Sequence, residues 1–334
     1  MECDTPMKTA GHTGEEGKAV PGNDRTPHTL RGGPSLGIVV SRNEIKEFLA
    51  SRRARITPQQ AGLPAYGGNR RVPGLRREEV AMLAGMSVDY YVRLERGNLS
   101  GASEAVLDSL ARALQLDEAE RDHLRDLARA ANTTPHRRRR APQQQTRVPP
   151  NVQRILDSMT DAPAFVRNSR LDLLAANRLG FALYAPLFAD GRKPPVNMAR
   201  FKFLDPRGRE FFGRHWEESM NNTVALLRTE AGRDPYDKVL TDLIGELVTR
   251  SEDFRTAWAR HNVRLHYTGL KHFHHPVVGD LTLAFDAMQL PAQPSLSLTA
   301  MSARPGSPDE DALKLLASWA ATDEAPPRGI RTSS

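Results

Sequence analysis

The sequence of 334 residues contains a single cysteine, Cys3, in a polar segment near the N-terminus. One thiol cannot close a disulfide within the chain or build a cysteine-based zinc site. This fits a reducing compartment, and we expect a cytoplasmic protein. No apolar run approaches the roughly 20 residues that span a bilayer, and the N-terminus has no apolar core of signal-peptide length. We therefore expect no membrane association.

The sequence also lacks the short motifs that mark common catalytic sites. It has no G-x-S-x-G elbow, Walker loop, H-E-x-x-H pair or G-x-G-x-x-G run. We therefore expect neither an enzyme nor a bound cofactor. The cluster HFHH (272–275) precedes Pro276 and offers no helical i, i+4 pair of histidines and no matching carboxylate. We interpret it as a structural turn and predict no metal site.

Aromatic residues make up only 6% of the chain, and they are unevenly spread. Ten of the eleven phenylalanines and all three tryptophans follow residue 150, which predicts a second domain with its own aromatic core. The net charge of +7 suits a phosphate-bearing partner. Composition and prolines predict five segments: a disordered tail over 1–40, a helical domain over 41–132, a basic proline-rich linker over 133–150, a second domain over 151–322 and a disordered tail over 323–334.

The segment RREEVAMLAGMSVDYYVRLERG (76–97) has the pattern of two helices joined by a sharp turn. Gly85 can end the first helix because glycine adopts positive φ at little cost, and Ser87 can cap the second. Apolar residues recur at helical spacing on both sides of this turn: Val80, Ala81, Ala84, Tyr91 and Leu94. The pattern predicts a helix-turn-helix that reads the major groove of DNA. The alternative is an ordinary helical hairpin.

The outward side chains of the second helix would face base edges and phosphates. Arg93 is the main candidate for base reading because a guanidinium can pair with both acceptors of guanine. Asp89 either accepts from cytosine or stabilises the helix N-terminus. The arginines before this helix either contact phosphates or form a solvated charge run. The predicted DNA-binding residues are Arg70, Arg71, Arg76, Arg77, Ser87, Val88, Asp89, Tyr90, Val92, Arg93 and Arg96.

We predict three more helices in the first domain. One starts at residue 44, one covers 103–114 behind the cap Ser103, and the last follows a reciprocal capping pair, Asp117 and Glu120. In the second domain, apolar runs on either side of Asn168 predict a hairpin over 163–178, and later runs predict strands over 280–290 and 295–303. Helical stretches lie between them, and a final helix covers 309–320. This order predicts an α+β fold.

These motifs resemble those of XRE-type (Cro/repressor) helix-turn-helix regulators with a C-terminal MmyB-like ligand-binding domain. The resemblance lies first in the segment GLRREEVAMLAGMSVDYYVRLERG. It continues, in chain order, in DAPAFVRNSRLDLLAANRLG, ARFKFLDP, LRTEAGRDP, FRTAWARHNVR, FHHPVVGDLTL and KLLASWA. The resemblance implies an all-α five-helix Cro/repressor-like DNA-binding domain followed by an α+β PAS-like ligand-binding domain. One departure is that Gly101 and Ala102 replace the Pro-Ser pair usual before the fourth helix.

The resemblance also implies that the second domain senses a small apolar molecule such as a fatty acid. The residues expected to line its pocket are Phe165, Asn177, Phe181, Tyr184, Phe203, Trp216, Trp258 and His261. The sequence does not choose among Asn177, Arg264 and His261 as a polar anchor for a carboxylate.

We thus expect a sequence-specific transcription regulator that binds double-stranded DNA as a homodimer on an inverted repeat. One alternative is a DNA-binding protein whose second domain only dimerises or recruits a protein partner. The other is a small-molecule enzyme tethered to DNA.

Overall fold

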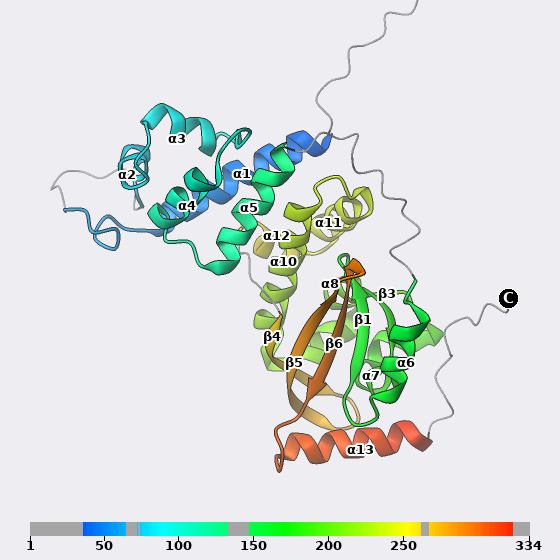
Figure 1. Cartoon of the computed structure of the whole chain (residues 1–334). Helices are drawn as coiled ribbons and strands as arrows, with labels where there is room; N and C mark the ends of the chain where they lie inside the picture. Colours follow the sequence, from blue (N-terminus) through cyan, green and yellow to red (C-terminus); the bar gives the residue numbers. More distant parts are fainter. Residues whose placement is uncertain (1–35, 65–71, 73, 133–146, 262–266, 323–334) are drawn as a thin grey trace, which may run out of the picture. The chain divides into compact units, whose positions relative to one another are not determined.

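The computed structural model describes residues 36–64, 72, 74–132, 147–261 and 267–322. The described residues from Leu36 onward belong to one compact unit. Its first part is helical (Figure 1), with α1 (Leu36–Arg55), α2 (Arg77–Leu83), α3 (Val88–Glu95), α4 (Glu104–Ala113) and α5 (Glu118–Asn132). Helix α1 begins at Leu36, whereas the predicted tail extended to residue 40.

The five helices bury one apolar core, to which α1 contributes Ile45, Phe48 and Leu49. The predicted caps are confirmed. The hydroxyl of Ser103 accepts a hydrogen bond from the Val106 amide at 3.3 Å. The Asp117 carboxylate accepts from the Glu120 amide at 2.9 Å, and the Glu120 carboxylate accepts from the Asp117 amide at 3.2 Å. These bonds satisfy amides that the first turn of a helix leaves without partners.

The second part of the chain combines helices with an antiparallel sheet, which agrees with the predicted α+β class. Its strands are β1 (Ala164–Asn168), β2 (Asp172–Ala176), β3 (Val196–Asn197), β4 (Thr268–His275), β5 (Gly279–Leu290) and β6 (Gln293–Ser302). They lie in the order β3-β2-β1-β6-β5-β4. The predicted hairpin is β1 with β2, and the predicted late strands are β5 and β6.

The interpretation of the HFHH cluster as a structural turn is wrong, because the cluster belongs to strand β4. Residues 272–275 lie in this strand, and the turn comes after them at residues 276–278. Phe273 and His275 are buried, whereas His272 is half-buried and His274 is exposed. This alternation is the period of two that a strand imposes, and the prediction gave too much weight to Pro276.

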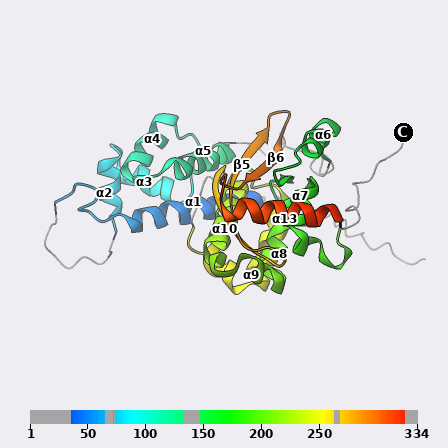
Figure 2. The same cartoon turned by 90° about the horizontal axis from the view of Figure 1, so that it is seen from below.

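Along the chain, helices come before the first strand, between strands and after the last strand. They are α6 (Pro150–Ser158), α7 (Arg178–Leu183), α8 (Met198–Leu204), α9 (Pro206–Phe212), α10 (Trp216–Arg233), α11 (Lys238–Arg250), α12 (Glu252–Trp258) and α13 (Pro308–Thr322), with two short 3₁₀ segments, η3 (Ala185–Gly191) and η4 (Gly213–His215). Helix α13 contacts α7 and β5 (Figure 2). None of the helices in the described part of the chain combines the length and apolar character needed to cross a bilayer.

Candidate DNA-binding surface and ligand pocket

Helices α2 and α3 form the helix-turn-helix that the sequence predicts. Gly85 joins them with φ of +65°, the left-handed region that favours glycine. The Ser87 hydroxyl caps α3 by accepting a hydrogen bond from the Tyr90 amide at 3.2 Å. Tyr91 and Leu94 point into the core and are almost fully buried. These contacts fix which side of α3 faces outward.

Helix α3 and its two cap residues carry seven of the eleven predicted DNA-binding residues. Arg93 is exposed, donates to the carbonyl of Ser100 at 3.2 Å and lies 5.9 Å from the centre of the Tyr90 ring. Arg70 and Arg71 lie outside the described residues. Among the other predicted residues, Tyr90 and Val92 are half-buried, and the exposed ones are Arg76, Arg77, Ser87, Val88, Asp89, Arg93 and Arg96.

Sequence reasoning missed the buried carboxylate of Glu95, which ties the helix-turn-helix together. Its Oε1 accepts from Arg53 Nε of α1 at 2.6 Å and from the Tyr91 hydroxyl at 3.2 Å. Its Oε2 pairs with Arg77, so this predicted phosphate contact also joins α2 to α3. The available signal was an acid beside Leu94 on the apolar side of the predicted helix, a place where charge requires a partner.

The second domain holds a cavity of about 80 Å³ between its sheet and its helices. Phe165 of β1, Thr299 of β6 and Ala287 of β5 are register partners that line the sheet side. Helices α8 and α10 provide much of the opposite side. A single water-sized group occupies roughly 10–15 Å³ on a comparable measure. The cavity therefore has room for a small molecule.

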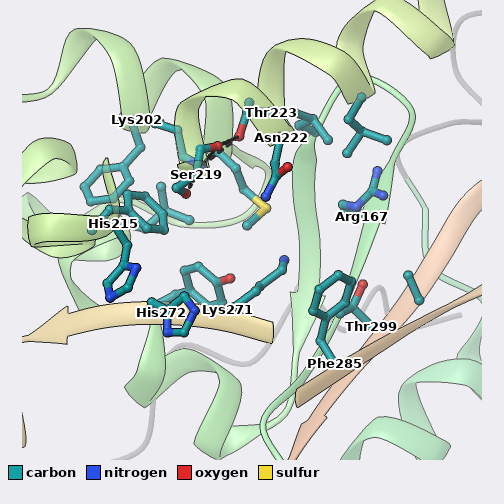
Figure 3. Close-up of a pocket in the computed structure, with 18 of the residues that line it drawn as sticks. Arg167, Lys202, His215, Ser219, Asn222, Thr223, Lys271, His272, Phe285 and Thr299 are labelled. Atoms are coloured by element: carbon teal, nitrogen blue, oxygen red, sulfur yellow. Dashed lines mark hydrogen bonds between the residues drawn. The ribbon is translucent and has the colours of Figure 1, made fainter. Parts of the chain in front are cut away.

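One arginine and two lysines line this cavity: Arg167 of β1, Lys202 of α8 and Lys271 of β4 (Figure 3). The Nζ of Lys271 lies 4.6 Å from the centre of the Phe285 ring and 5.8 Å from that of Phe165. It has no hydrogen bond or ion pair with any residue that the structure describes. Burial, with a contribution from the charge of Arg167, lowers the pKa of Lys271 to about 7.

Lys202 is held more firmly than Lys271. Its Nζ donates to the Ser219 carbonyl at 2.9 Å, the Ser219 hydroxyl at 2.6 Å and the Thr223 hydroxyl at 2.7 Å. Burial and the nearby charge of Lys271 lower the pKa of Lys202. Among the described residues that line the cavity, the only acid is Glu218, which is exposed and lies 4.0 Å from His215. The lining thus has an excess of basic groups, which favours an anion.

Two of the predicted pocket residues, Phe165 and Tyr184, line the cavity. Asn177 is not in the lining, because its amide holds the start of α7. Its oxygen accepts from the amides of Ala164 at 3.0 Å and Gly180 at 2.7 Å. Its nitrogen donates to the carbonyls of Met159 at 2.6 Å and Ala162 at 2.7 Å. These four bonds use the hydrogen-bonding capacity of the amide.

The other five predicted pocket residues pack elsewhere, and none is in the cavity lining. Phe181 contacts Phe188, Phe203 contacts Phe254 and Trp216, Trp258 stacks on Phe254, and His261 lies 2.9 Å from Arg228. Arg264 lies outside the described residues. The lysine and arginine residues of the lining that the sequence reasoning missed are Arg167, Lys202 in RFKFL and Lys271 in GLKHF. For Lys202 the available signal was a lysine between two phenylalanines in a predicted helical stretch, whereas Lys271, between Leu270 and His272, offered no such signal.

Among the described residues, two groups bring metal-type ligand atoms within 4.8 Å of one another: His215 with Glu218 and His272, and Glu44 with Glu47 and His261. In the first group the imidazole rings stack, with centres 3.9 Å apart and planes at 18°. Their in-plane lone pairs therefore run side by side instead of converging on one ion. In the second group Arg228 already pairs with Glu44. The geometry does not favour a metal at either place.

The fold and these two sites define a helix-turn-helix protein joined to a domain with a small-molecule cavity. Comparison with known families agrees. Residues 41–124 match the family described as a helix-turn-helix domain. Residues 148–316, just over half of the chain, match the MmyB-like transcription regulator ligand binding domain. The chain belongs to this family, and it is a DNA-binding transcription regulator with a ligand-sensing domain. No curated protein matches the sequence.

Proposed function

We propose that this regulator changes its affinity for DNA when a small amphipathic acid occupies the cavity of its second domain. The observation that carries this proposal is the ammonium group of Lys271, which faces an aromatic cavity with no acidic partner in the described chain. The family resemblance suggested an apolar ligand such as a fatty acid. The two lysines indicate that the ligand also has an anionic head group. The modest volume of the cavity favours a ligand with a short chain. A cavity between a curled sheet and helices also supports the PAS-like architecture.

Binding of such an acid regulates DNA affinity only if the acid prefers one conformation of the protein. We infer that α3 enters the major groove and that Arg93 reads a base there. One helix-turn-helix covers one half-site. We therefore propose a homodimer on an inverted repeat with half-sites about 34 Å apart. We further propose that the second domain senses its ligand without turning it over, because the matched families describe regulators.

The proposal predicts a discrete, symmetric footprint on the DNA upstream of the protein's own gene. The measurement is nuclease protection at physiological salt with excess random DNA, with and without octanoate, a short amphipathic acid. Octanoate should change the protein concentration needed for protection, since a coupled ligand typically alters affinity by about 5- to 150-fold. Binding that random DNA abolishes, or a monomer by light scattering both on and off the DNA, would contradict the proposal.

Replacing Arg93 by alanine should weaken binding to that site by about 1–3 kcal/mol and relax the preference at one base pair. The exposed Arg76 provides a comparison, since loss of a phosphate contact should weaken all sequences alike and reduce the salt dependence. The measurement is a titration of each variant against specific and random duplexes at several salt concentrations. Equal losses on both duplexes from Arg93→Ala would assign this arginine to the phosphate backbone instead.

A further inference from the structure

Helix α10 contributes to the cavity wall on one of its sides. Ser219, Thr223 and Leu226 recur at helical spacing, and all three line the cavity. Ser219 and Thr223 are also the hydroxyl partners of Lys202. A ligand head group that draws Lys202 toward itself must therefore break or shift bonds to α10. These bonds connect the basic lining of the cavity directly to this helix.

Another side of α10 contacts the DNA-binding domain. Arg228 of α10 forms an ion pair with Glu44 of α1. A Cβ placed on Gly232 of α10 would lie 2.6 Å from Cε1 of His123 on α5. A real Cβ does not approach a neighbouring atom this closely, so α5 and α10 are in direct contact there. One helix thus touches both the cavity and the DNA-binding domain.

The pair between Arg228 and Glu44 is largely buried, and the Glu44 side chain is 15% exposed. Arg228 is fully buried, donates to the carbonyl of Trp258, and has its guanidinium 4.0 Å from the centre of the Trp258 ring. Burial by itself would raise the pKa of Glu44, but the neighbouring His123 and Arg228 lower it to about 2. Because each buried charge depends on the other, the two helices cannot separate at this point without a large cost.

Helix α1 continues the connection to the recognition helix. Its Arg53 donates to Glu95 in the last turn of α3 at 2.6 Å. Gly97, two residues after the end of α3, has no room for a Cβ because the Arg42 carbonyl of α1 lies against it. A shift of α1 therefore moves the end of α3. The route from cavity to DNA surface has two largely buried ionic contacts: Arg228 with Glu44, and Arg53 with Glu95.

We propose that the Arg228–Glu44 pair transmits changes in the cavity wall from α10 to α1 and thereby to α3. The inference rests on the proposed function and names how the two sites communicate. Coupling between two binding sites is reciprocal. DNA binding must then alter the cavity side of α10, and this alteration can be measured without knowing the natural ligand.

The test is hydrogen exchange of the backbone amides of residues 219–226 in the full-length protein, free and bound to its upstream duplex. In the wild type, specific DNA should change exchange in this segment by about fivefold or more, whereas random DNA should not. In Arg228→Met the response should disappear. Arg209→Met is a matched control: Arg209 lies 4.8 Å from the centre of the Trp216 ring and pairs with Asp253 at 2.6 Å, all within the second domain. This variant should respond like the wild type.

A double variant, Glu44→Gln with Arg228→Met, covers the case in which the single change unfolds the protein, because it leaves no uncompensated charge. It should bind DNA and lack the exchange response. Wild-type protein that binds the duplex specifically with unchanged exchange over 219–226 would overturn the inference alone, as would a response that persists in the double variant. Failure to bind any duplex above random DNA would refute the proposed function and the inference with it.

Discussion

Octanoate should bind at least about 30-fold more weakly when Lys271 is replaced by methionine. The Nζ of Lys271 faces the cavity between the Phe165 and Phe285 rings. There its charge would meet a carboxylate largely shielded from water. Removing one partner of a buried charge pair costs about 2–5 kcal/mol, and each 1.4 kcal/mol is a factor of ten in affinity. Methionine has an unbranched apolar chain of four heavy atoms, like the stem of lysine without Nζ, so the change isolates the ammonium group.

Calorimetry on Lys271→Met with octanoate and with octanol gives the decisive comparison. Octanol, which has no charge, should bind the variant at least as well as the wild type, because the variant no longer buries an ammonium group. Lys238→Met provides the control, since Lys238 is exposed on α11 and pairs with Asp242 at 2.8 Å. If Lys271→Met bound octanoate as tightly as the wild type does, Lys271 would not contact the head group of the ligand.

The same interaction should make octanoate affinity fall as the pH rises. With the Lys271 pKa at about 7, the ammonium form dominates below this pH and is lost above it. A free carboxylic acid ionises at a pH of roughly 4–5, so both charges are present between about 5 and 7. Binding should be tightest there and weaken by up to about tenfold per pH unit above 7. The Lys202 pKa is also lowered, which acts in the same direction. A flat profile from pH 6 to 9 would contradict the lysine-carboxylate contact.

The helix-turn-helix could be predicted from the sequence because its determinants are local. The apolar spacing that places Tyr91 and Leu94 in the core lies within one turn of helix. Gly85 and Ser87 act on their immediate neighbours, through positive φ and a cap bond. The hairpin of β1 and β2 and the caps at Ser103 and Asp117 were found for the same reason. Such signals do not depend on how distant segments pack.

The cavity could not be predicted, because it depends on distant segments meeting. Lys202 and Lys271 come from a helix and a strand far apart in sequence, and neither forms part of a recognisable motif. The aromatic residues gave a misleading signal: Phe203 and Trp258 are as apolar as Phe165, but they pack around Phe254 in a separate core. Asn177 was identified correctly at the end of the opening hairpin, yet its four hydrogen bonds serve the fold.

Replacing Glu95 by alanine should destabilise the DNA-binding domain by about 3–5 kcal/mol, the usual cost of breaking a buried ion pair. Glu95 is 3% exposed and holds α1, α2 and α3 through Arg53, Arg77 and its contact with the Tyr91 hydroxyl. Its removal leaves Arg53 largely buried without this carboxylate. Glu78→Ala is the control: this exposed acid on α2 should alter stability by less than about 0.5 kcal/mol.

The measurement is urea unfolding, monitored through the hydrogen exchange of the α3 amides. This signal reports on the DNA-binding domain separately from the second domain. Burial alone would raise the pKa of Glu95, but hydrogen bonds from Arg53 and Arg77 hold it below its usual range. A lowered folded-state pKa gives stability that is present above the unfolded value and lost as the pH falls through the folded one. The wild type should therefore approach the stability of Glu95→Ala in acid. A constant difference between the two proteins from pH 7 to pH 3 would show that lost packing, and not the carboxylate charge, accounts for the effect.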